Sequence, residues 1–394
     1  MPQETKPDST RCVRGGIQPC DTSAAIPVPI VHCAPFSFES TGELIDFLEE
    51  RSGREQPEYS RMGNPTVRRV EQRLAALEGG EEARLFASGM AAITSAFLIY
   101  LSGGDHLILT RDCYKRTRDF AADFLPRFGI RTTVVEPNVD AVAEAVCGET
   151  RMIFTEVPTN PLLYVPDVER LGRLGRANDI LTFVDSTFAT PLNLRPLEWG
   201  IDLVVHSGTK YLGGHHDLVA GVLIGAGDAL EPVAELLPTL GGICDPQTAF
   251  LLDRGLKTLA LRVEHQNSAG QQVAEYLEAA PRVRRVFYPA LESHPQHEVA
   301  DRLLEGCGGV VSFVLDTDFE GTCRFIDALE LCILAPSLGG TETLVEPIVA
   351  MGYWDESEET RRRYEIDESL VRLAVGVEDA DDVVRDLDRA LERI

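Results

Sequence analysis

The sequence is short of lysine, of paired cysteines and of long apolar runs. Lysine occurs only as Lys6, Lys115, Lys210 and Lys257, and arginine supplies nearly all of the other positive charge. The nine cysteines are scattered and none forms a CxxC pair, which excludes the usual zinc and thioredoxin-like signatures. No stretch is long and apolar enough to span a bilayer, and residues 1–10 lack the apolar core of a signal peptide. We therefore expect a cytoplasmic protein with free thiols and no metal site.

Charge and length set further limits. The formal net charge of -26 disfavours binding to nucleic acid or to anionic membranes. A chain of 394 residues exceeds the usual size of one hydrophobic core, so more than one domain is expected. Residues 1–55 lack sustained periodicity but carry too many apolar side chains for a solvated tail. We predict an arm over 1–55 that packs on a partner subunit, a large domain over 56–245 and a C-terminal domain over 246–394.

Short apolar segments alternate with helical ones in the large domain. They predict strands at residues 106–109, 131–135, 151–155, 181–184 and 203–205. This alternation is typical of a mostly parallel sheet with helices on both faces, where ligands gather at the carboxyl ends of the strands. Beyond residue 240 the pattern predicts a long helix over 249–274, followed by a smaller α+β domain.

Two helix starts carry a capping residue. Asn64 precedes Pro65 at the first start, and Ser88 opens the second, where free backbone N–H groups favour an anion. Tyr59 and Arg61 lie in the loop before the first start. The planar fork of Arg61 suits a phosphate, and a solvated arginine is the alternative.

The stretch Ser207-Gly208-Thr209-Lys210 follows the last predicted strand. Ser207 and Thr209 can donate hydrogen bonds to phosphate oxygens, and Lys210 can form a Schiff base with an aldehyde while its amine is neutral. Because arginine supplies most of the positive charge, a lysine at this position indicates that the site requires an amine that can lose its proton. Lys257 is a rival without any phosphate cradle, and an ordinary surface turn is the alternative.

Three further side chains fit a cofactor of this kind. A buried carboxylate at Asp185 would be costly unless paired, and a protonated pyridine nitrogen would pair with it and keep the ring able to accept electrons. Tyr114 could stack on that ring, and Arg372 could clamp an α-carboxylate near the turn at Ser337. Taken singly, a capping aspartate, a core-edge tyrosine and a surface arginine are the alternatives.

Together these motifs resemble one family, the pyridoxal-phosphate enzymes of cysteine and methionine metabolism. It includes cystathionine γ-synthase, cystathionine γ-lyase and methionine γ-lyase. The resemblance covers the chain from about Phe38 to its end. It rests on Tyr59-Ser-Arg61 with Asn64-Pro-Thr66, Ser88-Gly-Met90, Asp185-Ser-Thr187, Ser207-Gly-Thr-Lys210-Tyr, Ser337-Leu-Gly-Gly340 and Arg372.

The resemblance implies the cofactor pyridoxal 5'-phosphate and the α/β fold type I of the aspartate-aminotransferase-like enzymes. Residues 56–245 would be the cofactor-binding domain. Lys210 would carry the Schiff base, and Tyr114 would stack on the ring and help the leaving group to depart. Other cofactor contacts would come from Ser88, Gly89, Met90, Asp185, Thr187, Ser207 and Thr209, and from Tyr59 and Arg61 of the neighbouring subunit. Ser337 and Arg372 would hold the substrate carboxylate in a homotetramer, a dimer of dimers that shares its active sites across the dimer interface.

Several positions depart from the family pattern: Lys115–Asp119, His215-His216, Pro336 and the segment 346–354. We expect them near the distal end of the substrate. Glu58, Arg116 and Arg118 would suit a polar or anionic distal group, and pairing among themselves at a subunit interface is the alternative.

The implied reaction is γ-elimination or γ-replacement on an L-amino acid related to homoserine, methionine or cystathionine, with a specialised substrate. A β-eliminating lyase acting on cystathionine or a cysteine conjugate is one alternative. A non-catalytic regulator that kept the cofactor fold is another.

Overall fold

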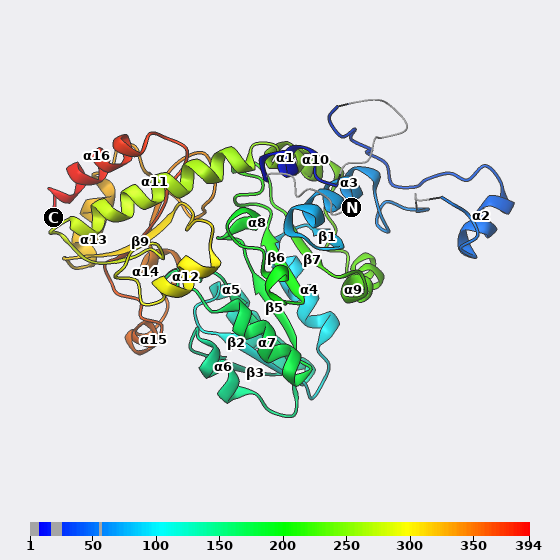
Figure 1. Cartoon of the computed structure of the whole chain (residues 1–394), viewed down its shortest axis with the longest axis horizontal. Helices are drawn as coiled ribbons and strands as arrows, with labels where there is room; N and C mark the ends of the chain where they lie inside the picture. Colours follow the sequence, from blue (N-terminus) through cyan, green and yellow to red (C-terminus); the bar gives the residue numbers. More distant parts are fainter. Residues whose placement is uncertain (1–7, 17–25, 55–56) are drawn as a thin grey trace.

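The computed structural model describes residues 8–16, 26–54 and 57–394, which form two sheets covered by helices (Figure 1). The larger sheet has the strand order β1-β7-β6-β5-β4-β2-β3. Strands β3, β2, β4, β5 and β6 run parallel, whereas β7 is antiparallel to both β6 and β1. The strands are β1 (Glu82–Phe86), β2 (His106–Thr110), β3 (Arg131–Val135), β4 (Thr150–Glu156), β5 (Leu181–Asp185), β6 (Leu203–Ser207) and β7 (Gly221–Gly225).

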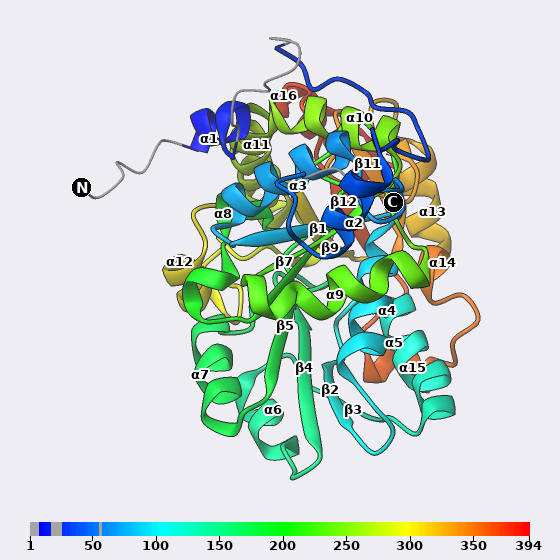
Figure 2. The same cartoon turned by 90° about the vertical axis from the view of Figure 1, so that its right-hand side faces the viewer.

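Helices cover both faces of this sheet, and Figure 2 shows α6 and α7 on one side of the strands and α4 and α5 on the other. One apolar cluster joins the sheet to α4 and α9, and a second joins it to α6 and α7. The helices before residue 245 are α1 (Asp8–Arg14), α2 (Thr41–Leu48), α3 (Pro65–Glu78), α4 (Gly89–Tyr100), α5 (Lys115–Asp119), α6 (Val139–Ala145), α7 (Val168–Asn178), α8 (Thr190–Asn193) and α9 (Gly227–Leu240). The predicted mostly parallel, doubly covered sheet is confirmed.

The smaller sheet has the order β10-β11-β12-β9-β8, and all of its pairs are antiparallel except β10 with β11. Its strands are β8 (Val283–Phe287), β9 (Val310–Leu315), β10 (Ile333–Leu334), β11 (Leu344–Pro347) and β12 (Leu370–Ala374). The helices of this part are α10 (Pro246–Leu256), α11 (Leu259–Ala279), α12 (His297–Leu303), α13 (Phe319–Asp327), α14 (Ile348–Gly352), α15 (Glu358–Arg363) and α16 (Ala380–Leu391). The domain boundary at 245/246 stays a prediction.

The single long helix predicted over 249–274 is wrong, because two helices, α10 and α11, meet at Lys257 and Thr258. The carbonyl of Gly255 accepts hydrogen bonds from Thr258 N and from Arg262 Nη2, so it does not continue the helical ladder. Gly255 also packs directly on the backbone of Gly213, where an added Cβ would lie 2.2 Å from the Gly213 oxygen. The break therefore fixes α10 against the turn that follows Lys210.

Both predicted capping residues act as caps. Asn64 Oδ1 accepts from Thr66 N at 2.9 Å at the start of α3, and Ser88 Oγ accepts from Ala91 N at 3.0 Å at the start of α4. Helix α3 ends at Gly79, which has the left-handed φ of 81° that favours glycine. These caps fix where the first turns of α3 and α4 lie.

The arm predicted over 1–55 includes residues 1–7, 17–25 and 55, which lie outside the described part of the chain. Its described part is tied to α3, because Thr66 Oγ1 donates to Pro29 O at 2.7 Å and Asn64 Nδ2 to Val31 O at 2.8 Å. Figure 1 shows α2 standing away from the rest of the molecule. Ile45 and Leu48 on α2 are 50% and 66% exposed, which leaves an apolar surface uncovered.

Across residues 8–16, 26–54 and 57–394, no helix combines the length and the apolar character that crossing a membrane requires.

Candidate active site

Lys210 lies where the two parts of the chain meet. Its Nζ donates a hydrogen bond to Ser337 Oγ at 2.8 Å, so the turn after β6 contacts the turn between β10 and β11. Burial, followed by the positive charge of Arg372, lowers the pKa of Lys210 to about 8. A substantial share of this amine is therefore neutral near physiological pH, as nucleophilic and proton-transfer chemistry requires.

The Ser337 turn is strained and tightly seated. Ser337 has a φ of 151°, a region that residues with a Cβ rarely adopt, and Gly339 has a φ of 74°. An added Cβ at Gly339 would lie 2.6 Å from Tyr211 N, so only glycine fits there. Strained backbone of this kind gathers at functional sites, and here it places the Ser337 hydroxyl on Lys210.

Arg372 is buried on β12 beside this turn. Its Nη1 donates to Asn160 Oδ1 at 2.8 Å, its Nη2 donates to Ser337 O at 3.2 Å, and Glu346 Oε1 lies 2.6 Å from Nη2. The buried Nε of Arg372 has no hydrogen-bond partner within the described chain. The guanidinium is therefore held in place by three acceptors while keeping donor capacity for a carboxylate.

Backbone groups gather at the N-terminus of α4, next to the end of β6. A Cβ on Gly89 would lie 3.1 Å from Ser207 Cβ, so glycine keeps the first turn of α4 open to Ser207. Ser207 N donates to Thr187 Oγ1 at 2.8 Å, and Thr209 Oγ1 exchanges hydrogen bonds with the backbone of Ala220. The arrangement combines free N–H groups, small residues and a helix dipole, which together suit an anion.

Two carboxyl groups lie side by side at the ends of β4 and β5. Glu156 and Asp185 are register partners, Glu156 Oε1 accepts from Tyr114 N at 2.5 Å, and Asp185 Oδ1 accepts from Thr187 N at 2.9 Å. Burial, with the charge of Asp185 adding to it, raises the pKa of Glu156 well above its usual value. Burial also raises the pKa of Asp185, while the two Thr187 hydrogen bonds oppose that rise. Burial therefore favours the neutral form of Glu156, and a cation near Asp185 would stabilise the charged form of Asp185.

Comparison with known proteins decides the family. The model of the family described as Cys/Met metabolism PLP-dependent enzyme matches residues 9–392. The chain belongs to this family. Members of this family use pyridoxal 5'-phosphate as cofactor. They have the fold type I of the pyridoxal-phosphate-dependent transferases.

Relatives within the family have several activities in their names. The chain is 46% identical over 372 residues to cystathionine gamma-synthase 1, chloroplastic, of Arabidopsis thaliana. The matched region covers 94% of this chain and 66% of that protein. It is 39% identical to a cystathionine beta-lyase of Lactococcus lactis, over 98% of both chains. It is 40% identical to an L-methionine gamma-lyase of Fusobacterium nucleatum, over 85% of this chain and 86% of that protein. The names therefore include both synthases and lyases.

Solved structures agree with the fold. The crystal structure of metB from Corynebacterium glutamicum superposes with a TM-score of 0.92 at 35% identity, over 98% of both chains. That of cystathionine gamma-lyase from Lactobacillus plantarum complexed with L-serine gives 0.92 at 36% identity, over 99% of both. The predicted fold type I is confirmed.

The residues present fit pyridoxal phosphate. The open turn at Gly89 and Ser207 offers a phosphate cradle that a Cβ would fill. Asp185 offers a half-buried carboxylate for the pyridine nitrogen, and Lys210 offers an amine of lowered pKa. Met90 follows Gly89 in the first turn of α4, and Thr117 Oγ1 donates to its sulfur at 3.6 Å. The Ser88 hydroxyl accepts the capping hydrogen bond from Ala91 N, which leaves its O–H available as a donor.

The structure shows different surroundings for the other predicted site residues. Arg61 donates from Nη1 to Pro238 O at 2.8 Å and lies over the ring of Tyr59, which is 43% exposed. None of the recorded contacts of Tyr59, Arg61 and the exposed Glu58 within the described chain reaches Lys210 or Asp185. Tyr114 is likewise 45% exposed, so its ring has a free face.

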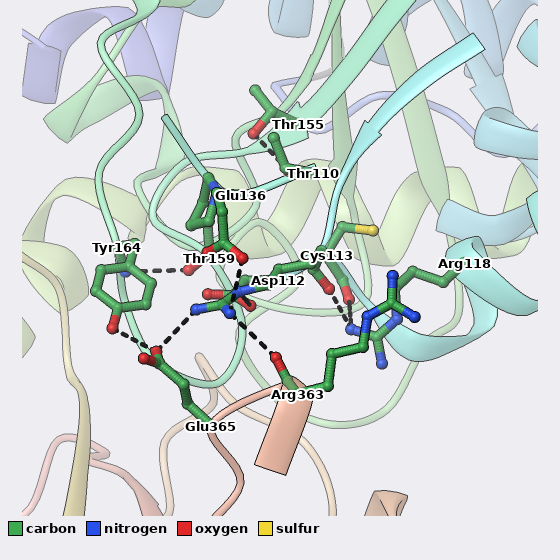
Figure 3. Close-up of polar contacts among 12 residues, drawn as sticks. Thr110, Asp112, Cys113, Arg118, Glu136, Thr155, Thr159, Tyr164, Arg363 and Glu365 are labelled. Carbon is green, nitrogen blue, oxygen red and sulfur yellow. Dashed lines mark hydrogen bonds and ion pairs between the residues drawn. The ribbon is translucent and has the colours of Figure 1, made fainter. Parts of the chain in front are cut away.

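Arg116 and Arg118 have structural partners instead of an open pocket. Arg118 is buried, and its guanidinium donates to the carbonyls of Arg111 and Cys113 (Figure 3). It also donates to Tyr353 Oη at 2.9 Å. Arg116 is 70% exposed and pairs with Asp119 at 3.6 Å. Nη1 and Nη2 of Arg118 thus have acceptors within the fold, and Arg116 lies on the surface, so the substrate-binding role of both residues stays a prediction.

Arg111, whose carbonyl accepts from Arg118, joins the end of β2 to Arg363 and Glu365, and Figure 3 shows these contacts. Arg111 Nη2 donates to Glu365 Oε2 at 2.8 Å, and Tyr164 Oη donates to the same carboxylate at 2.7 Å. Burial raises the pKa of Asp112 to about 7, and its Oδ2 has no partner among the described residues. The departures at 115–119 and 346–354 contact one another through Arg118 and Tyr353. Just beyond the second segment, Lys115 Nζ lies 3.0 Å from Glu356 Oε1.

Sequence reasoning missed Glu156, and it did not predict that Asn160 and Glu346 contact Arg372. Glu156 ends an apolar strand as Asp185 does, so the same signal could have found it. Asn160 follows a strand end, but its contact with Arg372 joins residues 212 apart in the chain. Glu346 faces Arg372 only through the pairing of β11 with β12, which the sequence pattern did not predict.

Proposed function

We propose that the protein catalyses elimination or replacement at the γ carbon of an L-amino acid of the homoserine, methionine or cystathionine type. One observation carries the proposal: a lysine with a pKa of about 8 hydrogen-bonds the turn that also contacts the buried Arg372. An amine that exchanges protons therefore lies next to a guanidinium that can hold an α-carboxylate. When bound, pyridoxal phosphate supplies an electron sink for the pair left on the α carbon.

The residues of the chain divide the remaining work. Arg372, oriented by Asn160 and the Ser337 carbonyl, would hold the substrate carboxylate and so fix the α carbon near Lys210 Nζ. Lys210 would take the α proton and move protons to and from the β carbon, which prepares the γ substituent to leave. Tyr114 would stack on the ring and assist the leaving group from its exposed side. Asp185 would pair with the pyridine nitrogen.

We also propose that sites are completed by a second subunit in a homotetramer. Tyr59, Arg61 and Glu58 lie in a loop after the arm, and their contacts within the chain leave them at its surface. Exposed apolar side chains lie nearby, with Met62 51% exposed and Leu240 49% exposed. A neighbouring subunit that covers this surface would bring its own phosphate site to Arg61.

A β-eliminating lyase is the second candidate, because the relatives include a cystathionine beta-lyase. A non-catalytic regulator is disfavoured, since such a protein has no need of a lysine with a lowered pKa beside a carboxylate clamp.

A substrate panel tests the proposal. The holoenzyme is incubated with O-acyl and O-phospho homoserine, methionine and cystathionine, with and without cysteine, and the products are identified by mass spectrometry. A keto acid with ammonia from a γ-substituted substrate, or a new thioether with cysteine, supports the proposal. Pyruvate from cystathionine with no γ chemistry supports the β-lyase, and no turnover of any amino acid contradicts both. Lys210→Ala should abolish every product, whereas Lys257→Ala, which removes a partner of Asp253 on α10, should not.

A further inference from the structure

Arg372 is paired with a carboxylate of its own chain before a substrate arrives. Glu346 Oε1 lies 2.6 Å from Arg372 Nη2, the two residues are register partners on β11 and β12, and both side chains are less than a tenth exposed. Its buried Nε–H has no acceptor among the described residues. A carboxylate that binds to this guanidinium therefore arrives beside a carboxylate of the protein.

The charged groups that face Glu346 in the described chain are Arg372 on β12 and Lys210 on the turn after β6. Burial raises the pKa of Glu346, and both of these cations oppose the rise. His216 packs on Gly340 and lies 3.9 Å from Glu342 rather than against Glu346. Two carboxylates that share one buried guanidinium repel each other, and a single proton relieves that repulsion.

We propose that Glu346 competes with the substrate for Arg372 and takes up a proton from solvent when the substrate carboxylate binds. The inference rests on the proposed function, because it requires Arg372 to hold a carboxylate. Charged Glu346 neutralises part of the guanidinium field and weakens binding. When Glu346 is protonated, the positive charge of Arg372 is no longer offset by Glu346 and attracts the ligand more strongly. Carboxylate binding therefore tightens as the pH falls.

The test uses butanoate, a carboxylate without an amino group that the enzyme cannot convert. Its binding to the holoenzyme is measured by calorimetry between pH 6 and 8.5, in buffers of different ionisation heat, so that proton uptake is read directly. The wild type should bind more weakly as the pH rises and should take up close to one proton per butanoate at the upper end. Butanamide, which has no charge, should produce no uptake.

Variants assign the proton. Glu346→Gln keeps the shape and a hydrogen-bond acceptor, so it should bind butanoate about threefold to tenfold more tightly at pH 8 with a flat pH profile. Glu346→Asp should restore the pH dependence. Glu342→Gln, which removes an exposed carboxylate of the preceding turn, should behave as the wild type.

The outcomes separate this inference from the proposed function. Weaker binding in Glu346→Gln, or proton uptake that persists in it, would show that Glu346 only orients Arg372 and would overturn the inference. Wild-type binding without proton uptake would overturn it as well and leave the proposed function intact. If butanoate does not bind at all, Arg372 does not hold a carboxylate. That outcome would overturn both this inference and the proposed function. If Glu346→Gln fails to fold, Glu346→Ala takes its place, and proton uptake that persists in Glu346→Ala overturns the inference.

Discussion

Glu156 and Asp185 are register partners on the adjacent parallel strands β4 and β5, and a single proton on Glu156 is the arrangement that their surroundings favour. Asp185 accepts from Thr187 N, which stabilises its charge, whereas Glu156 is raised in pKa by burial and by Asp185. The sequence showed only Asp185. The neighbouring acid explains how that carboxylate stays charged without a second negative charge beside it.

The Glu156 proton makes stability depend on pH. A carboxyl group whose pKa is raised by folding stabilises the protein below its unfolded pKa, and that contribution is lost as the pH rises through the folded value. An amide resembles the protonated acid at every pH. Glu156→Gln should therefore not lose this stability as the pH rises. We expect Glu156→Gln to be equal to the wild type at pH 5 and more stable by about 1 kcal/mol at pH 8. Urea unfolding at both pH values measures this, and a variant that is less stable at pH 8 than the wild type would contradict it.

The pKa of Lys210 predicts how fast the apoprotein takes up its cofactor. Only the neutral amine attacks an aldehyde, so the rate should rise with pH and level off above about 8. Arg372→Gln removes a positive charge that lowers this pKa and should move the midpoint upward. Stopped-flow absorbance between pH 6 and 10 follows the reaction. An unchanged midpoint in Arg372→Gln would show that Arg372 does not act on Lys210.

Arg118 is expected to stabilise the fold rather than to bind substrate. Its buried guanidinium donates to two carbonyls and to Tyr353 Oη and lies 4.2 Å from the centre of the Tyr364 ring. Arg118→Met should cost about 2–4 kcal/mol in the free energy of unfolding and expose residues 353–365 to proteases. Arg116→Met, on the exposed side of α5, should change it by less than about 0.5 kcal/mol. A raised KM with unchanged stability in Arg118→Met would return Arg118 to the substrate pocket.

Active sites shared between subunits make a mixing experiment possible. Lys210→Ala and Arg61→Ala chains should each be inactive as pure oligomers. Refolded together, they form mixed dimers in which one site has both residues intact, so about a quarter of the wild-type activity should return. Recovery should fail between Lys210→Ala and Asp185→Asn, because both residues belong to the same subunit's site. No recovery in the first mixture would place Arg61 in its own subunit's site or outside any site.

Much of the fold followed from local pattern. The strands β2 to β6 and the caps at Asn64 and Ser88 were predicted because apolar runs and capping residues act over a few positions. Strands β1, β7, β10 and β11 were not predicted. The partner of β1 is β7, far along the chain, and β10 is only 2 residues long. The break between α10 and α11 depends on Gly255 meeting Gly213, which periodicity does not reveal.

The site divides in the same way. Lys210, Asp185 and Arg372 carried recognisable chemistry at strand ends or in a glycine-rich turn. The acceptors that orient Arg372, namely Asn160 and Glu346, are set by contacts between segments that are distant in sequence. Arg118 looked like a ligand for an anion because a basic sequence does not show whether its charges are already paired.

The central claim is that Lys210 is the lysine that binds the cofactor. Borohydride reduction of the holoenzyme fixes the cofactor on its lysine, and digestion with peptide mass spectrometry locates it. We expect the label on Lys210 alone, at about one per chain, and its loss in Lys210→Ala. A label on Lys115 or Lys257, or no label in a fully loaded enzyme, would contradict the account.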